Sequence, residues 1–318
     1  MNEVPISTRE LPFTETYGNF ANRRYRGFRM PPHESVSDPS ERRSMYERRR
    51  IRVFDARHAQ PQPTLLRNGF TLIKFRSAVH NLLDQDEVTN LFYSECARIV
   101  QSLTSCDSVT VTQHQYRNGY AGLPVDHPKS ARPTPNGSEG VYGGIHSDVT
   151  PYSEPNWKNL VDGCHFQVFN LWCRSVKRQT IEVMPLSLCD PASVDPKDMI
   201  CADSWNQTMH RNRLVSYRLA FNENQQWFHF PRMRSNEMLV FKQYDSRCTQ
   251  PNLRCVYHGA IEDPHTRPNA PLRETIEVRV LALYEKERDK KQRVCRFQNE
   301  IPKHLPDGQE SKWLVQYS

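Results

Sequence analysis

Residues 273–280 read Arg-Glu-Thr-Ile-Glu-Val-Arg-Val, a stretch in which apolar and polar side chains alternate from Thr275 onward. Successive side chains of a β-strand point to opposite faces of its sheet. The apolar members of this stretch therefore share a face that packs, and its charged and hydroxyl members share the face that can look into a barrel. The stretch predicts a half-buried strand in a closed or layered β-structure.

Similar runs recur on both sides of this strand. They are rich in β-branched and aromatic residues and are separated by clusters of Pro, Asn, Asp and Gly. The runs are Ser108–Thr112, His165–Trp172, Leu214–Phe221, Glu237–Gln243 and Glu274–Tyr284. One amphipathic helix is predicted from Asp84, its N-cap, because apolar residues follow at spacings of three and four as far as Leu103. Many strands with few helices predict a mainly β fold.

Three regions are predicted along the 318 residues. Residues 1–50 form an extended basic arm, residues 51–285 form the β-rich body, and residues 286–318 form a charged tail. The first 60 residues hold twelve Arg, no Lys and eight acids, which accounts for much of the net charge of +7. Arg interleaved with Tyr and Phe can bind nucleic acid. We instead expect this arm to pair with acidic groups of the body or of a second subunit in a homo-oligomer.

Several classes of protein lack their minimum signal here. The chain has no G-x-G-x-x-G, P-loop or G-x-S-x-G motif, which excludes the common nucleotide-binding and serine-hydrolase patterns. Nine cysteines without a C-x-x-C pair favour reduced thiols over a disulfide framework or a zinc ribbon. No stretch approaches the ~20 apolar residues that a membrane helix needs. A cytoplasmic protein with no membrane or nucleic-acid partner is expected.

The residues that carry chemistry begin with the H-x-D string of His146 and Asp148. Two residues apart on an extended segment, their side chains share one face and can bind one metal. His258, 110 residues after Asp148, is the best third ligand. Two His and one carboxylate leave three positions of an Fe(II) ion open, which suits an oxo-acid and dioxygen. We therefore predict that His146, Asp148 and His258 are both the metal ligands and the catalytic centre.

A cation is then needed for the far carboxylate of the oxo-acid. Arg273 heads the alternating strand, and its planar guanidinium can grip a carboxylate with two hydrogen bonds. Thr275 lies on the same face and can add a hydroxyl donor. The residues predicted to contact the substrate are Asn170, Trp172, Arg279 and Tyr116. His229 is expected to be structural, because most histidines in an aromatic strand are hydrogen-bonded core residues. His114 follows a strand, and a solvated or core role is favoured for it over lining the cavity.

The chain resembles the asaB-type hydroxylase/desaturase family in these motifs and in several further blocks. Examples of these blocks are Asp55-Ala56-Arg57, Asn68-Gly69-Phe70 and residues 241–246 (Phe-Lys-Gln-Tyr-Asp-Ser). This group is similar to gibberellin-desaturase-like proteins and to a cephamycin methoxylation component. The resemblance covers about Val53 to Tyr284. It implies a distorted double-stranded β-helix (a cupin-like jelly roll) with flanking helices, and the cofactors Fe(II), 2-oxoglutarate and O2. The implied reaction is hydroxylation or desaturation of a small-molecule natural product in secondary metabolism.

Two other functions are compatible with the same residues. A zinc-dependent hydrolase also uses two His and one carboxylate, although the chain lacks H-E-x-x-H and an obvious general base. A non-catalytic jelly roll that binds a ligand or partner is the second alternative. The hydrolase gives no role to the strand that begins at Arg273, and the intact set of candidate ligands argues against the non-catalytic jelly roll.

Overall fold

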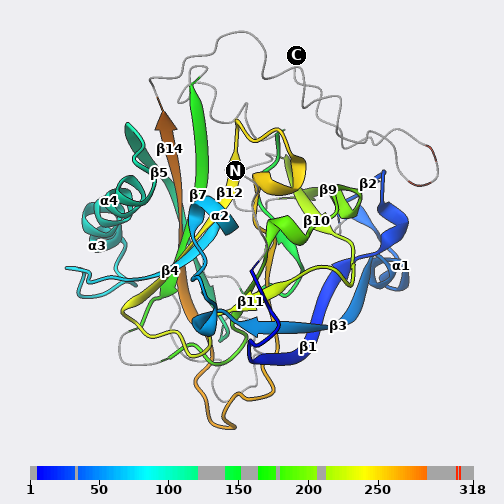
Figure 1. Ribbon diagram of the computed structural model, residues 1–318, viewed down its shortest axis with the longest axis horizontal. Helices are drawn as coiled ribbons and strands as arrows, with labels where there is room; N and C mark the ends of the chain where they lie inside the picture. Colours follow the sequence, from blue (N-terminus) through cyan, green and yellow to red (C-terminus); the bar gives the residue numbers. More distant parts are fainter. Residues whose placement is uncertain are drawn as a thin grey trace.

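The computed structural model describes residues 6–32, 35–120, 140–151, 164–176, 180–205 and 213–284, together with positions 306 and 308. Their strands form two sheets, one of nine strands in the order β1-β3-β11-β8-β13-β6-β10-β9-β2 and one of five in the order β4-β12-β7-β14-β5. Figure 1 shows the five-stranded sheet upright on one side, with helices α3 and α4 outside it. The predicted tail lies outside the described residues apart from those two positions.

The strands of the five-stranded sheet are β4 (Phe70–Lys74), β5 (Ser108–Asn118), β7 (His165–Arg174), β12 (Glu237–Asp245) and β14 (Glu274–Tyr284). Those of the nine-stranded sheet are β1 (Phe13–Ala21), β2 (Arg29–Met30), β3 (Tyr46–Asp55), β6 (His146–Ser147), β8 (Leu186–Cys189), β9 (Met199–Trp205), β10 (Arg213–Leu219), β11 (Trp227–His229) and β13 (His258–Ala260). All five predicted strands are present, and the last has the predicted bounds.

The chain passes back and forth between the two sheets. It runs β5, β6, β7 and β8 in alternate sheets, adds the β9–β10 hairpin, and then alternates again through β11, β12, β13 and β14. Strands β5-β14-β7-β12 lie side by side in one sheet, and β6-β13-β8-β11 lie side by side in the other. Two facing four-stranded sheets connected in this way form a jelly roll. The prediction of a mainly β, double-stranded β-helix fold is confirmed.

Helical segments connect and cover the sheets. The α-helices are α1 (Pro39–Ser44), α2 (Leu65–Asn68), α3 (Gln85–Glu87) and α4 (Tyr93–Thr104), and one π-helical turn is η4 (Val88–Phe92). The short 3-10 turns are η1 (Arg23–Tyr25), η3 (Ala56–His58), η6 (Pro191–Ser193), η7 (Pro196–Asp198) and η8 (Pro251–Arg254). No helix in the described parts of the chain combines the length and apolarity needed to cross a membrane.

Helices α3 and α4 form the predicted amphipathic helix, interrupted by η4. The Asp84 carboxylate accepts hydrogen bonds from the backbone N–H groups of Asp86 and Glu87, as an N-cap does. The helix buries one side against the outer face of the five-stranded sheet. The buried residues of this side are Val88, Phe92, Cys96 and Val100. Their spacing of four residues places them on a single helical stripe.

We expect Phe92→Ala to lower the free energy of unfolding by about 3–5 kcal/mol, because it removes a fully buried ring and leaves a cavity. The neighbouring Leu91 is 43% exposed and serves as a matched control. Leu91→Ala should cost about 1 kcal/mol or less. Urea unfolding followed by circular dichroism measures both values. Equal costs for the two substitutions would contradict the placement of the helix on the sheet.

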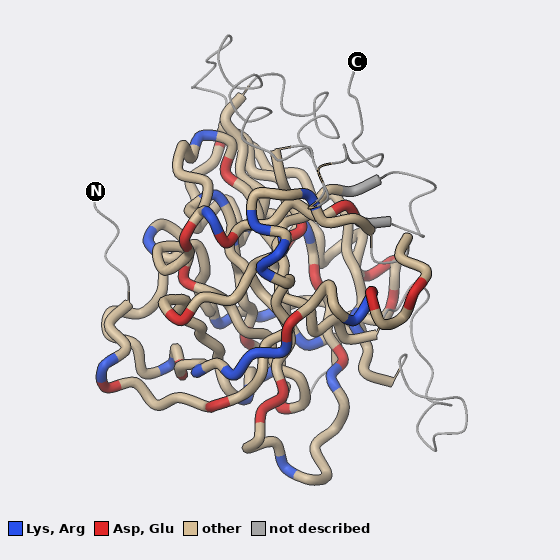
Figure 2. Tube along the Cα trace, turned by 90° about the vertical axis from the view of Figure 1, so that its right-hand side faces the viewer, with Lys and Arg blue, Asp and Glu red and all other residues tan. Residues whose placement is uncertain are grey.

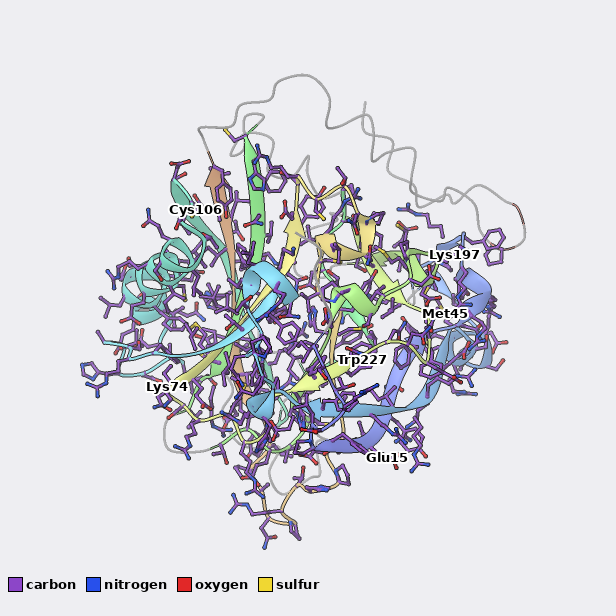
Figure 3. The ribbon with its side chains drawn as sticks, in the orientation of Figure 1. Glu15, Met45, Lys74, Cys106, Lys197 and Trp227 are labelled. Atoms are coloured by element: carbon purple, nitrogen blue, oxygen red, sulfur yellow. The ribbon has the colours of Figure 1, made fainter. Side chains whose placement is uncertain are left out.

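The N-terminal region differs from the expected extended arm. Strand β3 crosses residue 51 and pairs antiparallel with β1 over its length, and β11 then pairs with β3 in parallel. Figure 3 shows Met45 beside α1, and its side chain is fully buried. Composition alone did not predict this strand, because its arginines at 48–50 and 52 are exposed and only Ile51 and Val53 are buried. Some of the basic side chains form ion pairs with nearby acids, such as Arg49 with Glu47 and Arg50 with Glu15. Figure 2 shows basic and acidic residues interspersed along the trace.

Candidate metal centre

Three predicted ligands converge between the two sheets. His146 begins β6 and His258 begins β13, and the two residues are directly opposite each other in the antiparallel β6–β13 pair. Asp148 follows β6 immediately. One ligand atom from each residue lies within 4.8 Å of the other two. The tertiary structure therefore brings together residues separated by 110 positions, because β6 and β13 are neighbours in the jelly roll.

Backbone carbonyls orient both imidazoles. Nδ1 of His146 lies 2.8 Å from the carbonyl oxygen of Gly144, and Nδ1 of His258 lies 3.3 Å from that of Val256. An Nδ1–H that donates to a carbonyl leaves the lone pair of Nε2 for a metal. Burial, with a further contribution from His146, lowers the pKa of His258 to about 3. The neutral ring is the form that binds a metal.

The Asp148 carboxylate is held by two side chains from the opposite sheet. Arg279 donates from Nη2 to Oδ2 at 2.6 Å, and Asn170 donates from Nδ2 to the same oxygen at 3.1 Å. Oδ1 instead faces Nε2 of His146 at 3.2 Å. Burial opposes ionisation, but Arg279 and the two imidazoles keep the pKa of Asp148 well below its usual range. One oxygen of an ionised carboxylate is thus left for a metal.

Glu277 completes this network. Its Oε1 accepts a hydrogen bond from Nδ2 of Asn170 at 2.9 Å. Burial and the neighbouring charge of Asp148 raise the pKa of Glu277 to about 7. Asn170 and Arg279 were predicted to touch the substrate, and in the structure they contact the predicted metal ligand Asp148. The sequence offered a partial signal, since alternation places Glu277 and Arg279 on one strand face.

Gln243 supports the H-x-D segment and was not singled out in the sequence. Its Oε1 accepts hydrogen bonds from the backbone N–H of Asp148 at 2.9 Å and from the hydroxyl of Ser147 at 3.2 Å. The register of β12 shifts beside it, between Lys242 and Tyr244. Such a bulge re-aims a side chain. Short-range patterns do not reveal a bulge, so this residue is found only in the folded chain.

Arg273 is buried next to an aromatic ring. Its guanidinium carbon lies 5.4 Å from the centre of the Trp172 ring, and Nη1 donates to the carbonyl oxygen of Met184 at 2.7 Å. Nε is buried and has no hydrogen-bond partner. Burial, with the nearby charge of Arg117, lowers the pKa of Arg273 to about 9. These features make a site that an anionic group would stabilise. Thr275 lies two residues further on and is also buried.

The remaining predicted residues lie in different places. Trp172 packs in the apolar cluster between the sheets, beside Leu239 and Phe241. Tyr116 lies opposite Ile276 in the β5–β14 pair and packs with it against the helices, and its hydroxyl donates to the carbonyl of Leu82. The structure therefore does not bring Tyr116 to the predicted metal ligands, because strand alternation turns its side chain to the other face of the sheet.

The two histidines expected to be structural lie apart from the ligands. His229 is buried in β11, where burial lowers its pKa. His114 approaches the Tyr93 hydroxyl through Nδ1 at 2.7 Å, beneath α4. Among the described residues, the group of His, Asp, Glu or Cys side chains close enough to hold one metal ion is His146, Asp148 and His258. Two imidazole nitrogens and one carboxylate oxygen match the donor set of non-haem iron.

Comparison with known proteins identifies related oxidoreductases. The model of the oxidoreductase/YMDC permease-like domain matches residues 19–283, which is more than half of the chain. The α-ketoglutarate-dependent dioxygenase phiK of a fungal species is 27% identical over 68% of this chain and 78% of its own length. The hydroxylase/desaturase asaB of Aspergillus flavus is 28% identical over 37% of this chain and 55% of its own length.

A solved structure supports the fold. The iron and α-ketoglutarate-dependent endoperoxidase NvfI superposes with a TM-score of 0.67 at 20% identity, covering 86% of this chain and 98% of that chain. At this identity the likeness establishes the jelly roll alone. The sequence-based prediction of an asaB-type oxygenase is confirmed by the named relatives. The chain belongs to the oxidoreductase/YMDC permease-like domain family.

Proposed function

We propose that the chain is an Fe(II)- and 2-oxoglutarate-dependent oxygenase whose metal is bound by His146, Asp148 and His258. The observation that carries the proposal is the convergence of two oriented imidazoles and one ionised carboxylate, with ligand atoms within 4.8 Å of one another. Zinc can bind the same donors. The dioxygenase and hydroxylase/desaturase names of the relatives favour iron.

The side chains around Asp148 determine how many metal positions stay open. Arg279 and Asn170 both donate to Oδ2, so Asp148 offers Oδ1 to the metal as a single ligand. Three protein ligands then leave room for the two oxygens of an oxo-acid and for dioxygen. Iron bound there, with 2-oxoglutarate and dioxygen, supplies the oxidising power that removes hydrogen from an unactivated carbon.

Arg273 binds the far carboxylate of 2-oxoglutarate in this proposal, and Thr275 adds a hydroxyl donor. The support is the buried guanidinium, whose Nε has no hydrogen-bond partner. Trp172 lies over the guanidinium, so the carboxylate approaches the edge where the N–H groups point. Hydrogen bonds between the guanidinium and this carboxylate would be strong, because the local dielectric constant in the buried site is low.

The organic substrate is a small-molecule natural product, hydroxylated or desaturated according to how its carbon is held near the metal. Relatives that carry the hydroxylase/desaturase name support this choice. Trp172, which is buried in the cluster between the sheets, contributes to the wall of the substrate site in this proposal. A cytoplasmic location, a homo-oligomeric state and the absence of a nucleic-acid partner stay predictions.

The experiment that tests the proposal uses metal-free protein supplied with 2-oxoglutarate and oxygen. We expect addition of Fe(II) to give succinate even without an organic substrate, through slow uncoupled turnover, and addition of Zn(II) to give none. Succinate is measured by chromatography. Ester or amide hydrolysis by the Zn(II)-loaded protein, without succinate from the Fe(II)-loaded protein, would favour the hydrolase alternative.

A further inference from the structure

A pocket of about 420 Å³ lies between the N-terminal region and the edge of the nine-stranded sheet. The region before β3 supplies Met30, Arg42 and Arg43 to its wall, and β10 supplies Arg218. This pocket is distinct from the binding place proposed for 2-oxoglutarate, because Arg273 and Trp172 do not line it. The region predicted from composition as an arm therefore forms part of a cavity.

The charges in this pocket are predominantly positive. Arg42 donates twice to the carbonyl of Val36, at 3.0 and 2.8 Å, which fixes its guanidinium without neutralising it. Asp203 also lines the pocket, but Arg29 already binds both of its oxygens, at 2.8 and 2.6 Å. Arg43 and Arg218 add further positive charge. The field in the pocket thus favours an anion.

Arg218 is the part of the pocket most suited to binding a ligand. Its Nη1 donates to the Ser216 hydroxyl at 2.9 Å, and its Nε is buried without a hydrogen-bond partner. Burial raises the pKa of the adjacent Tyr46 to about 12, so its phenol is protonated at neutral pH. The Tyr46 phenol is hydrogen-bonded to Arg218 and to Tyr142, so the three side chains form one cluster on the pocket wall. Guanidinium and phenol donors together match a carboxylate or a similarly acidic oxygen group.

The pocket adjoins the metal centre on the side of His146. Arg218 and His146 are directly opposite each other in the β6–β10 pair, so their side chains share one face of the sheet. The Tyr142 ring meets the His146 ring edge-on at 4.9 Å and lies 5.7 Å from the Arg218 guanidinium carbon. A Cβ at Gly144 would come 2.7 Å from the Tyr142 oxygen, so glycine permits this close approach. Tyr142 therefore stands between the pocket and the metal ligands.

We propose that this pocket binds the organic substrate of the oxygenase through an ionised acidic group, with Arg218 as the anchor and the N-terminal region as the outer wall. The substrate class is then an anionic natural product, such as a carboxylic acid, whose reacting carbon passes Tyr142 toward the metal. This inference rests on the proposed function. The acidic group, and not the carbon skeleton, fixes the position of the substrate.

The test compares two probes of the same shape, 2-naphthoate and 2-naphthamide, by anaerobic titration calorimetry on the full chain loaded with Fe(II) and saturating 2-oxoglutarate. The wild-type protein should bind the carboxylate at least tenfold more tightly than the amide. Arg218→Gln should abolish this preference, Arg218→Lys should retain part of it, and Arg43→Gln should reduce it at least threefold. Equal binding of the two probes by the wild-type protein overturns the proposal.

Arg50→Gln is the matched control, because Arg50 is an exposed arginine of β3 that pairs with Glu15 and does not line the pocket. It should leave the preference unchanged. Should Arg218→Gln fail to fold, as judged by circular dichroism, Arg43→Gln decides the matter, and an unchanged preference then overturns the proposal. An equal loss of 2-oxoglutarate affinity in Arg218→Gln also overturns it, since the pocket would then bind the co-substrate.

Failure of this inference and failure of the proposed function give different results. Succinate formation from 2-oxoglutarate reports the proposed function without any organic substrate. Succinate without discrimination between the probes rejects the pocket assignment alone. Discrimination without succinate rejects the oxygenase reaction, and with it the identification of the bound acid as the substrate of that reaction.

Discussion

Replacing His146, Asp148 or His258 with alanine is expected to abolish Fe(II) binding at micromolar metal and to reduce turnover to background. In the proposed site each residue supplies one of the three protein ligands, and removal of one leaves a pair that cannot hold the metal with the same geometry. The measurements are anaerobic Fe(II) titration, with one Fe(II) expected per chain of wild-type protein, and succinate formation.

His265→Ala is the control for these variants, because this side chain is 65% exposed and lies outside the ligand group. It should bind one Fe(II) and turn over like the wild-type protein. Circular dichroism separates lost binding from lost fold, which matters for the buried His258. Full activity in any one of the three ligand variants would remove that residue from the metal site.

Arg273→Ala should raise the 2-oxoglutarate concentration needed for half-maximal succinate formation by at least a hundredfold. Loss of one member of a buried charge pair typically costs about 3–5 kcal/mol, and a hundredfold change corresponds to about 2.7 kcal/mol. Arg273→Lys keeps the charge but loses the planar fork, so its requirement should be intermediate. Fe(II) affinity measured without 2-oxoglutarate should change little in either variant.

Substitutions of two other arginines, Arg267 and Arg279, serve as comparisons for the Arg273 variants. Arg267 is 66% exposed and pairs with Glu182, so Arg267→Ala should leave the 2-oxoglutarate requirement unchanged. Arg279→Ala should behave in the opposite way to Arg273→Ala, because Arg279 donates to Asp148 and its loss should weaken Fe(II) binding first. A raised 2-oxoglutarate requirement with unchanged Fe(II) affinity in Arg279→Ala, and no effect in Arg273→Ala, would transfer the carboxylate-binding role to Arg279.

The N-terminal region shows where composition misled the sequence analysis. The many arginines and prolines of residues 1–50 predicted an extended arm, and strand β3 includes three of these arginines, Arg48 to Arg50. In the structure this stretch pairs with β1, and the apolar residues that follow it, Ile51 and Val53, enter the core. A local window could not show that pairing, because the partner strand lies some thirty residues away and its own alternation is weak.

The sequence by itself determined the strands with regular alternation and the amphipathic helix, and it identified the candidate metal ligands His146, Asp148 and His258. The strands and the helix depend on short-range periodicity, and the candidate ligands depend on residue types that bind transition metals. The register of β14 against β7, which brings Arg279 opposite Asn170 and both to Asp148, was decided by the tertiary structure. The bulge that aims Gln243 at Asp148, and the pocket at Arg218, were decided in the same way. The physical reason is that these contacts join strands far apart in the sequence, and their geometry depends on sheet order and register, which no single stretch of the chain encodes.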